Sequence, residues 1–123
     1  MTKKWWIRRI RAACEGVGSY KEENDSVIET LAGILEKRDA AEKQFRAEGK
    51  QLIVSHTNKN GSTNSVKNPL IALINELNRD ALSYWRDLGL TPAGLKKIKD
   101  VDPTVPTESN SNVQKLIHAL EDI

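Results

Sequence analysis

The chain has 123 residues, 38% of them apolar, and a formal net charge of +2. This length suits one domain with a modest core, and so mild a charge does not by itself indicate a nucleic-acid partner. The single Cys14 excludes an intrachain disulfide, and no group of Cys and His has metal-site spacing. We therefore expect no metal and no cofactor, and we expect copies of the chain to cover apolar surface that the small core leaves open.

Residues 3–15 are predicted to form a short amphipathic helix, ended by Gly16 and Gly18. Its apolar side holds, at helical spacing, Trp6, Ile10, Ala13 and Cys14. Its other side holds Lys4, Arg8, Arg11 and Glu15, with Arg9 flanking it. The arginines interrupt the apolar region of a possible signal peptide, and no apolar run reaches the roughly 20 residues that cross a bilayer. We expect a soluble intracellular protein with no membrane partner.

Residues 20–48 are predicted to form a long helix. Ser19 and Glu22 have the spacing of a capping box, and Gly49 follows the last periodic residue, as a C-terminal glycine does. One apolar stripe runs along this helix and contains Val27, Ile28, Leu31, Ile34, Leu35, Ala41 and Phe45.

Residues 51–67 predict a small β-hairpin, or a flexible loop that forms one only when packed. Ile53, Val54 and Thr57 favour extended structure, and Asn60-Gly61 suits the positive φ angles of a type I′ turn. An isolated two-stranded hairpin is only marginally stable in water, so this element would depend on its surroundings.

A second long helix is expected over residues 69–89. Asn68 is suited to cap its first turn, and Pro69 fits the first helical position, where its missing N–H is not needed. Gly89 ends it, and Thr91 with Pro92 begins another short helix that reaches about residue 98 by the same pattern. The apolar stripe of the long helix contains Leu70, Leu73, Ile74, Leu77, Ala81, Tyr84, Trp85 and Leu88.

Together these elements predict a mainly all-α fold. An antiparallel pair of long helices is joined by a small β-hairpin or loop, with short flanking helices at both ends. We divide the chain into a basic N-terminal helical segment (1–18), a helical-hairpin oligomerisation core (19–99), a proline-containing linker (100–110) and a short C-terminal helix (111–123). The last helix is too short to be stable alone and is expected to dock onto this protein or onto another.

Charge is unevenly distributed along the chain. Residues 1–21 hold six Lys or Arg against one Glu, whereas residues 22–48 hold eight acidic against four basic residues. The basic first helix is therefore a candidate DNA surface, because phosphate contacts dominate the affinity of proteins for DNA. The alternatives are a solvated face, or an arm that docks onto the acidic helix 20–48 of its own or a neighbouring subunit. The candidate residues are Lys3, Lys4, Arg8, Arg9 and Arg11.

A second basic group follows the second long helix. It contains Lys96, Lys97 and Lys99, together with Lys59 and Lys67 of the loop. These residues are candidates for DNA contact, although lysines at a helix C-terminus also complement its dipole.

The order of several short motifs resembles the phage terminase small subunit family. The motifs are GSY, END, EGK and NG, followed by KNPLIALINELNRDALSYWRDLGLTPAG, and they span residues 16–100. The most specific are NP at the start of the second long helix and LGLTP at its end. The resemblance implies a non-catalytic homo-oligomeric ring, phage or prophage encoded and acting in the bacterial cytoplasm. Such a ring binds double-stranded viral DNA and delivers it to the terminase large subunit, which holds the ATPase and nuclease.

Several aromatic and apolar residues could either pack within the protein or contact a partner. Trp5 and Trp6 could stack on nucleic acid, but we expect Trp6 to pack in the core. The tail helix is expected to dock either on the large subunit or on an apolar patch of its own oligomer. We expect the subunit interface to use Leu31, Ile34, Leu35, Leu73, Ile74, Leu77, Tyr84 and Trp85.

No catalytic constellation is visible in the sequence. His56 and His118 are far apart and have no Asp or Cys at a catalytic spacing, and no glycine-rich phosphate loop supports ATP binding. Cys14 is expected to be a small buried hydrophobic residue. The alternative function is a small helical phage or plasmid regulator that acts as a protein–protein interaction module.

Overall fold

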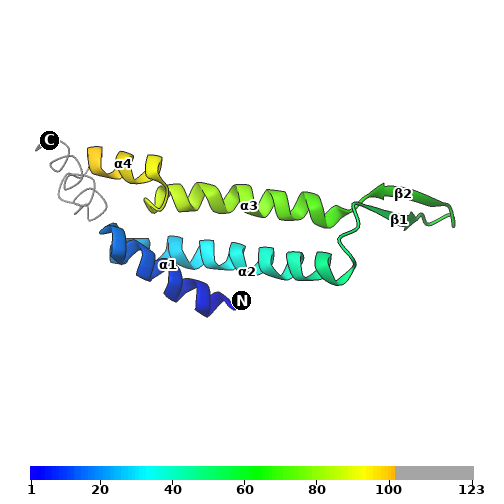
Figure 1. Cartoon of the computed structure of the whole chain (residues 1–123), viewed down its shortest axis with the longest axis horizontal. Helices are drawn as coiled ribbons and strands as arrows, with labels where there is room; N and C mark the ends of the chain where they lie inside the picture. Colours follow the sequence, from blue (N-terminus) through cyan, green and yellow to red (C-terminus); the bar gives the residue numbers. More distant parts are fainter. Residues whose placement is uncertain (102–123) are drawn as a thin grey trace, which may run out of the picture.

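The computed structural model describes residues 1–101, and the predicted helix 111–123 and His118 lie outside this range. Two long helices, α2 (Asp25–Ala47) and α3 (Pro69–Asp87), run antiparallel (Figure 1). α1 (Lys3–Val17) packs along α2, and α4 (Pro92–Val101) follows the end of α3. The hairpin of β1 (Ile53–Thr57) and β2 (Thr63–Lys67) projects from the opposite end. The predicted mainly helical fold with a small β-hairpin is confirmed.

The hydrophobic core lies at the end of the helical pair where α1 packs. Its buried residues come from α1, the first half of α2 and the last part of α3. Nearer the hairpin, Ala41 is the one buried apolar residue among those described. The core cluster consists of Ile10, Cys14, Ile28, Leu31, Ala32, Leu35, Ala81 and Leu88.

The start of α2 differs from the predicted capping box. Ser19 is 3% exposed, and its hydroxyl donates a hydrogen bond of 2.7 Å to the carbonyl of Leu88 at the end of α3. A short 3₁₀ turn, Glu22–Asn24, precedes α2, which begins only at Asp25 and has no side-chain cap. The capping-box prediction is wrong because Ser19 bonds to a distant helix end.

The end of α1 also lies later than predicted. The helix continues through Gly16 and stops at Gly18, whose φ of 77° is left-handed. The amide of Ser19 then donates to the carbonyl of Cys14 at 2.9 Å, which is the six-to-one bond of a Schellman motif. Gly18 alone, and not Gly16, therefore ends the helix.

The hairpin turn is not the predicted type I′. The two strands are antiparallel, with Thr57 opposite Thr63, so the loop covers residues 58–62. Gly61 has a φ of 84°, but Asn60 does not have a positive φ, as a type I′ turn would require. Within these five residues, the amide of Asn58 donates to the carbonyl of Ser62 at 2.7 Å and the amide of Gly61 donates to the carbonyl of Asn58 at 3.0 Å. The first bond leaves three residues, 59–61, between its partners, and the left-handed Gly61 is the last of them, as in three-residue hairpin loops.

The caps predicted for α3 and α4 are confirmed. The side chain of Asn68 accepts a hydrogen bond from the amide of Leu70 at 3.0 Å, and the hydroxyl of Thr91 accepts one from the amide of Gly94 at 3.1 Å. α4 extends to Val101, so its last turn includes the first residues of the predicted linker. The rest of that linker lies outside the described residues.

Candidate nucleic-acid interface

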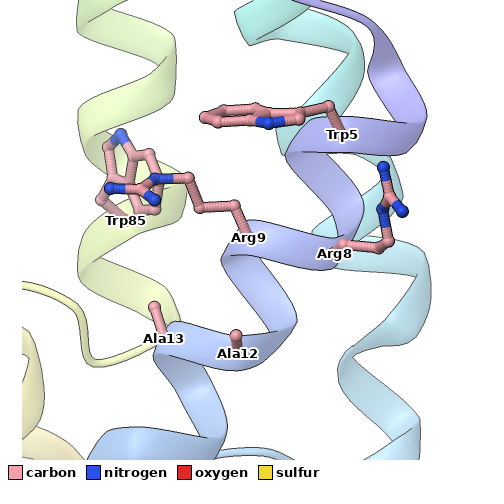
Figure 2. A pocket seen from close by; sticks show the side chains of 6 residues that line it. All are labelled: Trp5, Arg8, Arg9, Ala12, Ala13 and Trp85. Carbon is pink, nitrogen blue, oxygen red and sulfur yellow. The ribbon is translucent and has the colours of Figure 1, made fainter.

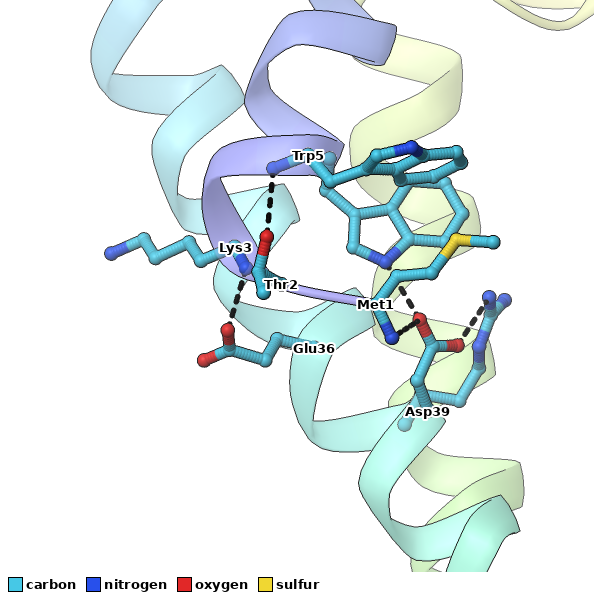
Figure 3. Close-up of polar contacts among 8 residues, drawn as sticks. Met1, Thr2, Lys3, Trp5, Glu36 and Asp39 are labelled. Carbon is cyan, nitrogen blue, oxygen red and sulfur yellow. Dashed lines mark hydrogen bonds and ion pairs between the residues drawn. The ribbon is translucent and has the colours of Figure 1, made fainter.

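Two carboxylates of α2 position the first turn of α1 (Figure 3). The backbone N–H of Lys3 donates to a carboxylate oxygen of Glu36. The indole N–H of Trp6 donates to a carboxylate oxygen of Asp39 at 2.7 Å. Since Trp6 also packs against the core, as expected, this side of α1 is fixed and the opposite side faces outward.

Two of the basic residues predicted to bind DNA are paired with α2. The ammonium of Lys3 lies 3.3 Å from Glu29, and the guanidinium of Arg11 lies 3.2 Å from Asp25. These pairs correspond to the alternative in which the basic helix docks onto the acidic helix of its own chain. They leave Lys3 and Arg11 less available to phosphates than their neighbours.

Asp25 also accepts a hydrogen bond from the hydroxyl of Tyr20 at 2.9 Å. This hydrogen bond favours the protonated phenol and is the main cause that raises the pKa of Tyr20. The guanidinium of Arg11 lies 5.6 Å from the centre of the Tyr20 ring. Arg11 is thus held by an aromatic ring and by a carboxylate.

Lys4, Arg8 and Arg9 are exposed on α1. Within residues 1–101, neither Lys4 nor Arg8 forms an ion pair. Arg9 lies over the ring of Trp5, with 5.3 Å between the guanidinium carbon and the ring centre. These three cations are the part of the predicted cluster that is available to an anionic partner.

A hollow of about 610 Å³ lies between α1 and α3 (Figure 2). Aromatic, cationic and small side chains line it, and none of the carboxylates in the described part of the chain does. The lining residues are Trp5, Arg8, Arg9, Ala12 and Ala13 of α1 and Trp85 of α3.

A second hollow, of about 820 Å³, connects α1 with the lysines of α4. Ala13 borders both hollows, and Lys96 and Lys99 line the second. The predicted basic residues of α1 and α4 therefore adjoin one continuous surface, while Lys97 is exposed on α4. Lys59 and Lys67 belong to the hairpin at the other end of the molecule (Figure 1), so their predicted grouping with the α4 lysines is wrong.

Three basic residues of α2 were missed by the sequence reasoning. These residues, Arg38, Lys43 and Arg46, line a further hollow with Trp5 and Arg9, and the carboxylates of Asp39 and Glu42 line it too. Residues 22–48 have a net negative charge, but all four of their basic residues come after Glu36. The order of charges within the helix, rather than their sum, could have indicated this surface.

The predicted interface residues fall into three groups by burial. Leu31 and Leu35 are fully buried in the core of the chain itself. Leu73 is 43% exposed, and within α3 only Ala81 is buried. The remaining predicted residues are half-buried, namely Ile34, Ile74, Leu77, Tyr84 and Trp85.

Cys14 and His56 differ in burial. Cys14 is fully buried, and this burial raises the pKa of its thiol. His56 is exposed on β1. Residues 1–101 contain no group of three or more His, Cys, Asp or Glu that could hold a metal ion, and no helix among them is long and apolar enough to cross a membrane.

The fold and its surface define a helical-hairpin protein with a basic helix docked at one end. A family model described as phage terminase, small subunit matches residues 2–104. The chain therefore belongs to the phage terminase small subunit family, and the match includes α1, which the sequence motifs did not cover. No curated protein and no solved structure matches the chain. Members of this family are phage-encoded and generally non-catalytic.

Proposed function

We propose that the chain is the non-catalytic, DNA-binding small subunit of a viral terminase. It binds double-stranded phage DNA in the host cytoplasm and delivers it to the large subunit, which holds the ATPase and nuclease. Family membership supports the packaging role. The observation that carries DNA binding is the group of exposed cations Lys4, Arg8 and Arg9 on α1, since Lys and Arg bind phosphates and release counterions.

The uncovered apolar surface of α3 supports a homo-oligomeric ring. Leu73 is 43% exposed on one side of α3, and Leu82, nine residues later and therefore on the opposite side of the helix, is 47% exposed, although a monomer gains stability by burying such side chains. Repeated contact between this surface and a different surface of the next copy produces a closed ring when the rotation between copies closes.

Duplex binding by charge-reversed variants tests the DNA-binding role. Lys4→Glu with Arg8→Glu should weaken binding to duplex DNA at least about tenfold, with a shallower salt dependence than the unmodified chain. Lys59→Glu with Lys67→Glu makes the same change in net charge at the hairpin and is the matched control. Fluorescence anisotropy across a salt series measures both pairs.

Two results would contradict the proposal. If both charge-reversed pairs bind as the unmodified chain does, α1 does not bind DNA, and the chain acts instead as a protein-interaction module. If light scattering at micromolar concentration finds only monomers, the ring is excluded.

A further inference from the structure

Trp5 occupies an unusual position for so large an aromatic residue. It is half-exposed, and it contacts Trp6 edge to face, with ring centres 4.8 Å apart and an interplanar angle of 88°. It does not belong to the residues packed against the core, whereas Trp6 and Trp85 do. Burial in the core of this chain therefore does not explain an indole at position 5.

The hollow beside Trp5 combines two kinds of group. Trp5 and Trp85 supply indole rings and Arg9 supplies positive charge, while Arg8 lines the edge of the hollow on the side of α1 away from Trp85 (Figure 2). Among residues 1–101, no acidic side chain lines it. Arg9 lies over an aromatic ring, and it forms no ion pair with any residue from 1 to 101.

This combination matches the chemistry of a nucleotide with an unpaired base. An indole face stacks on a flat base, and a guanidinium binds phosphate. Duplex DNA offers the phosphates, but its base faces are already stacked on one another. Phosphate contacts alone would need the arginines and not the indole of Trp5, which does not pack against the core.

We propose that the hollow between α1 and α3 binds single-stranded DNA. An unpaired base stacks on the indoles of Trp5 and Trp85, while Arg8 and Arg9 contact the adjoining phosphates. Lys43 and Arg46 line the neighbouring hollow, which shares Trp5 and Arg9 and also contains Asp39 and Glu42, and they offer further phosphate contacts along the strand. This inference rests on the proposed DNA-binding function and adds to it a preference for unpaired nucleotides.

The test compares oligothymidylate with a duplex of the same length by fluorescence anisotropy. Trp5→Leu should weaken binding to the single strand at least about fivefold, because stacking on an aromatic ring contributes substantially per base. Its binding to duplex should stay within about twofold of the unmodified chain. Circular dichroism confirms folding, which is expected because Trp5 lies outside the core cluster.

A matched pair of charge variants separates the hollow from general electrostatics. Arg9→Gln and Lys4→Gln each remove one positive charge from the exposed part of α1, but only Arg9 lines the hollow. Arg9→Gln should weaken single-strand binding more than Lys4→Gln does. Equal losses would overturn the proposal and leave a purely electrostatic surface.

Photocrosslinking gives a direct readout of the site. An oligonucleotide that contains 5-iodouracil should crosslink to Trp5 or Trp85, and mass spectrometry identifies the residue. Crosslinks at neither residue would overturn the proposal. So would a Trp5→Leu variant that binds the single strand normally but forms smaller oligomers, because the hollow would then be a subunit contact.

The results that would contradict the proposed function differ from those that would contradict this inference. If the unmodified chain does not bind duplex DNA, the DNA-binding function as a whole is contradicted. Normal duplex binding with no effect of Trp5→Leu on the single strand contradicts only the inference about this hollow.

Discussion

The indole N–H of Trp6 on α1 donates a hydrogen bond of 2.7 Å to Asp39 on α2. The guanidinium of Arg38 donates to the same carboxylate at 3.1 Å, and it lies 5.6 Å from the centre of the Trp6 ring. Arg38 also reaches Asn78 on α3 at 3.4 Å. One partly buried network therefore connects the basic helix with both long helices.

Removal of the Asp39 carboxylate should destabilise the fold. Asp39→Ala leaves the Trp6 indole N–H without its acceptor and Arg38 without its neighbouring negative charge, so the free energy of unfolding should fall by about 1–3 kcal/mol. Glu42→Ala removes a nearby carboxylate outside this network and should change it by less than about 0.5 kcal/mol. Urea unfolding measures both, and equal losses would show that the network does not anchor α1.

Gly94 should not tolerate a side chain. A Cβ there would collide with the backbone carbonyl of Arg86, so Gly94→Ala must push α4 away from α3 and should cost about 1–3 kcal/mol. Gly16→Ala is the control, because nothing lies within 4 Å of its added Cβ, and a helical alanine should add about 0.5–1 kcal/mol. Thermal unfolding should shift in opposite directions, and a neutral Gly94→Ala would show that α4 is not closely packed.

The exposed apolar side of α3 should control assembly. Leu73→Glu places a charge on a 43% exposed apolar position, which an interface would have to desolvate at a cost of several kcal/mol. The mass found by light scattering should therefore fall while the helical signal stays unchanged. Asn75→Glu adds the same charge at an exposed polar position of α3 and should preserve the assembly, so equal masses for the two variants would place the interface elsewhere.

Cys14 should resist alkylation until the chain unfolds. It is fully buried, and burial raises the pKa of its thiol above the usual 9.0, so the reactive thiolate is scarce near neutral pH. Because the folded state favours the neutral thiol, Cys14 contributes fully to stability below pH 9.0, and this contribution is lost as the pH rises through the folded pKa. Iodoacetamide labelling followed by mass spectrometry should be slow in buffer and fast in urea, and fast labelling of the folded chain would contradict the burial of Cys14.

The sequence predicted the elements whose signals are local. Asn68 and Thr91 cap their helices because each side chain bonds to an amide two or three residues away, and such contacts need no tertiary context. The apolar periodicity likewise predicted the helical pair, since one face of each helix must be buried. The turn at Asn60-Gly61 was assigned the wrong type because the dipeptide fixes a left-handed glycine but not the loop length.

Tertiary packing decided what the surface of the molecule presents. Ser19 looked like a helix cap in the sequence, but its hydroxyl bonds to Leu88, which lies 69 positions away in the chain. The basic residues of α1 looked equivalent, but the contact with α2 pairs Lys3 and Arg11 with carboxylates and leaves Arg9 beside Trp5.

By itself, the sequence determined the helices, their caps and the uneven spread of charge, because hydrogen bonds within one turn and a regular apolar spacing are local properties. The three-dimensional arrangement decided which cations stay available, and it brought Trp85 of α3 to the same hollow as Trp5 of α1. The physical reason is that core burial sets how the helices lie against one another, and only this arrangement determines which charges and rings meet.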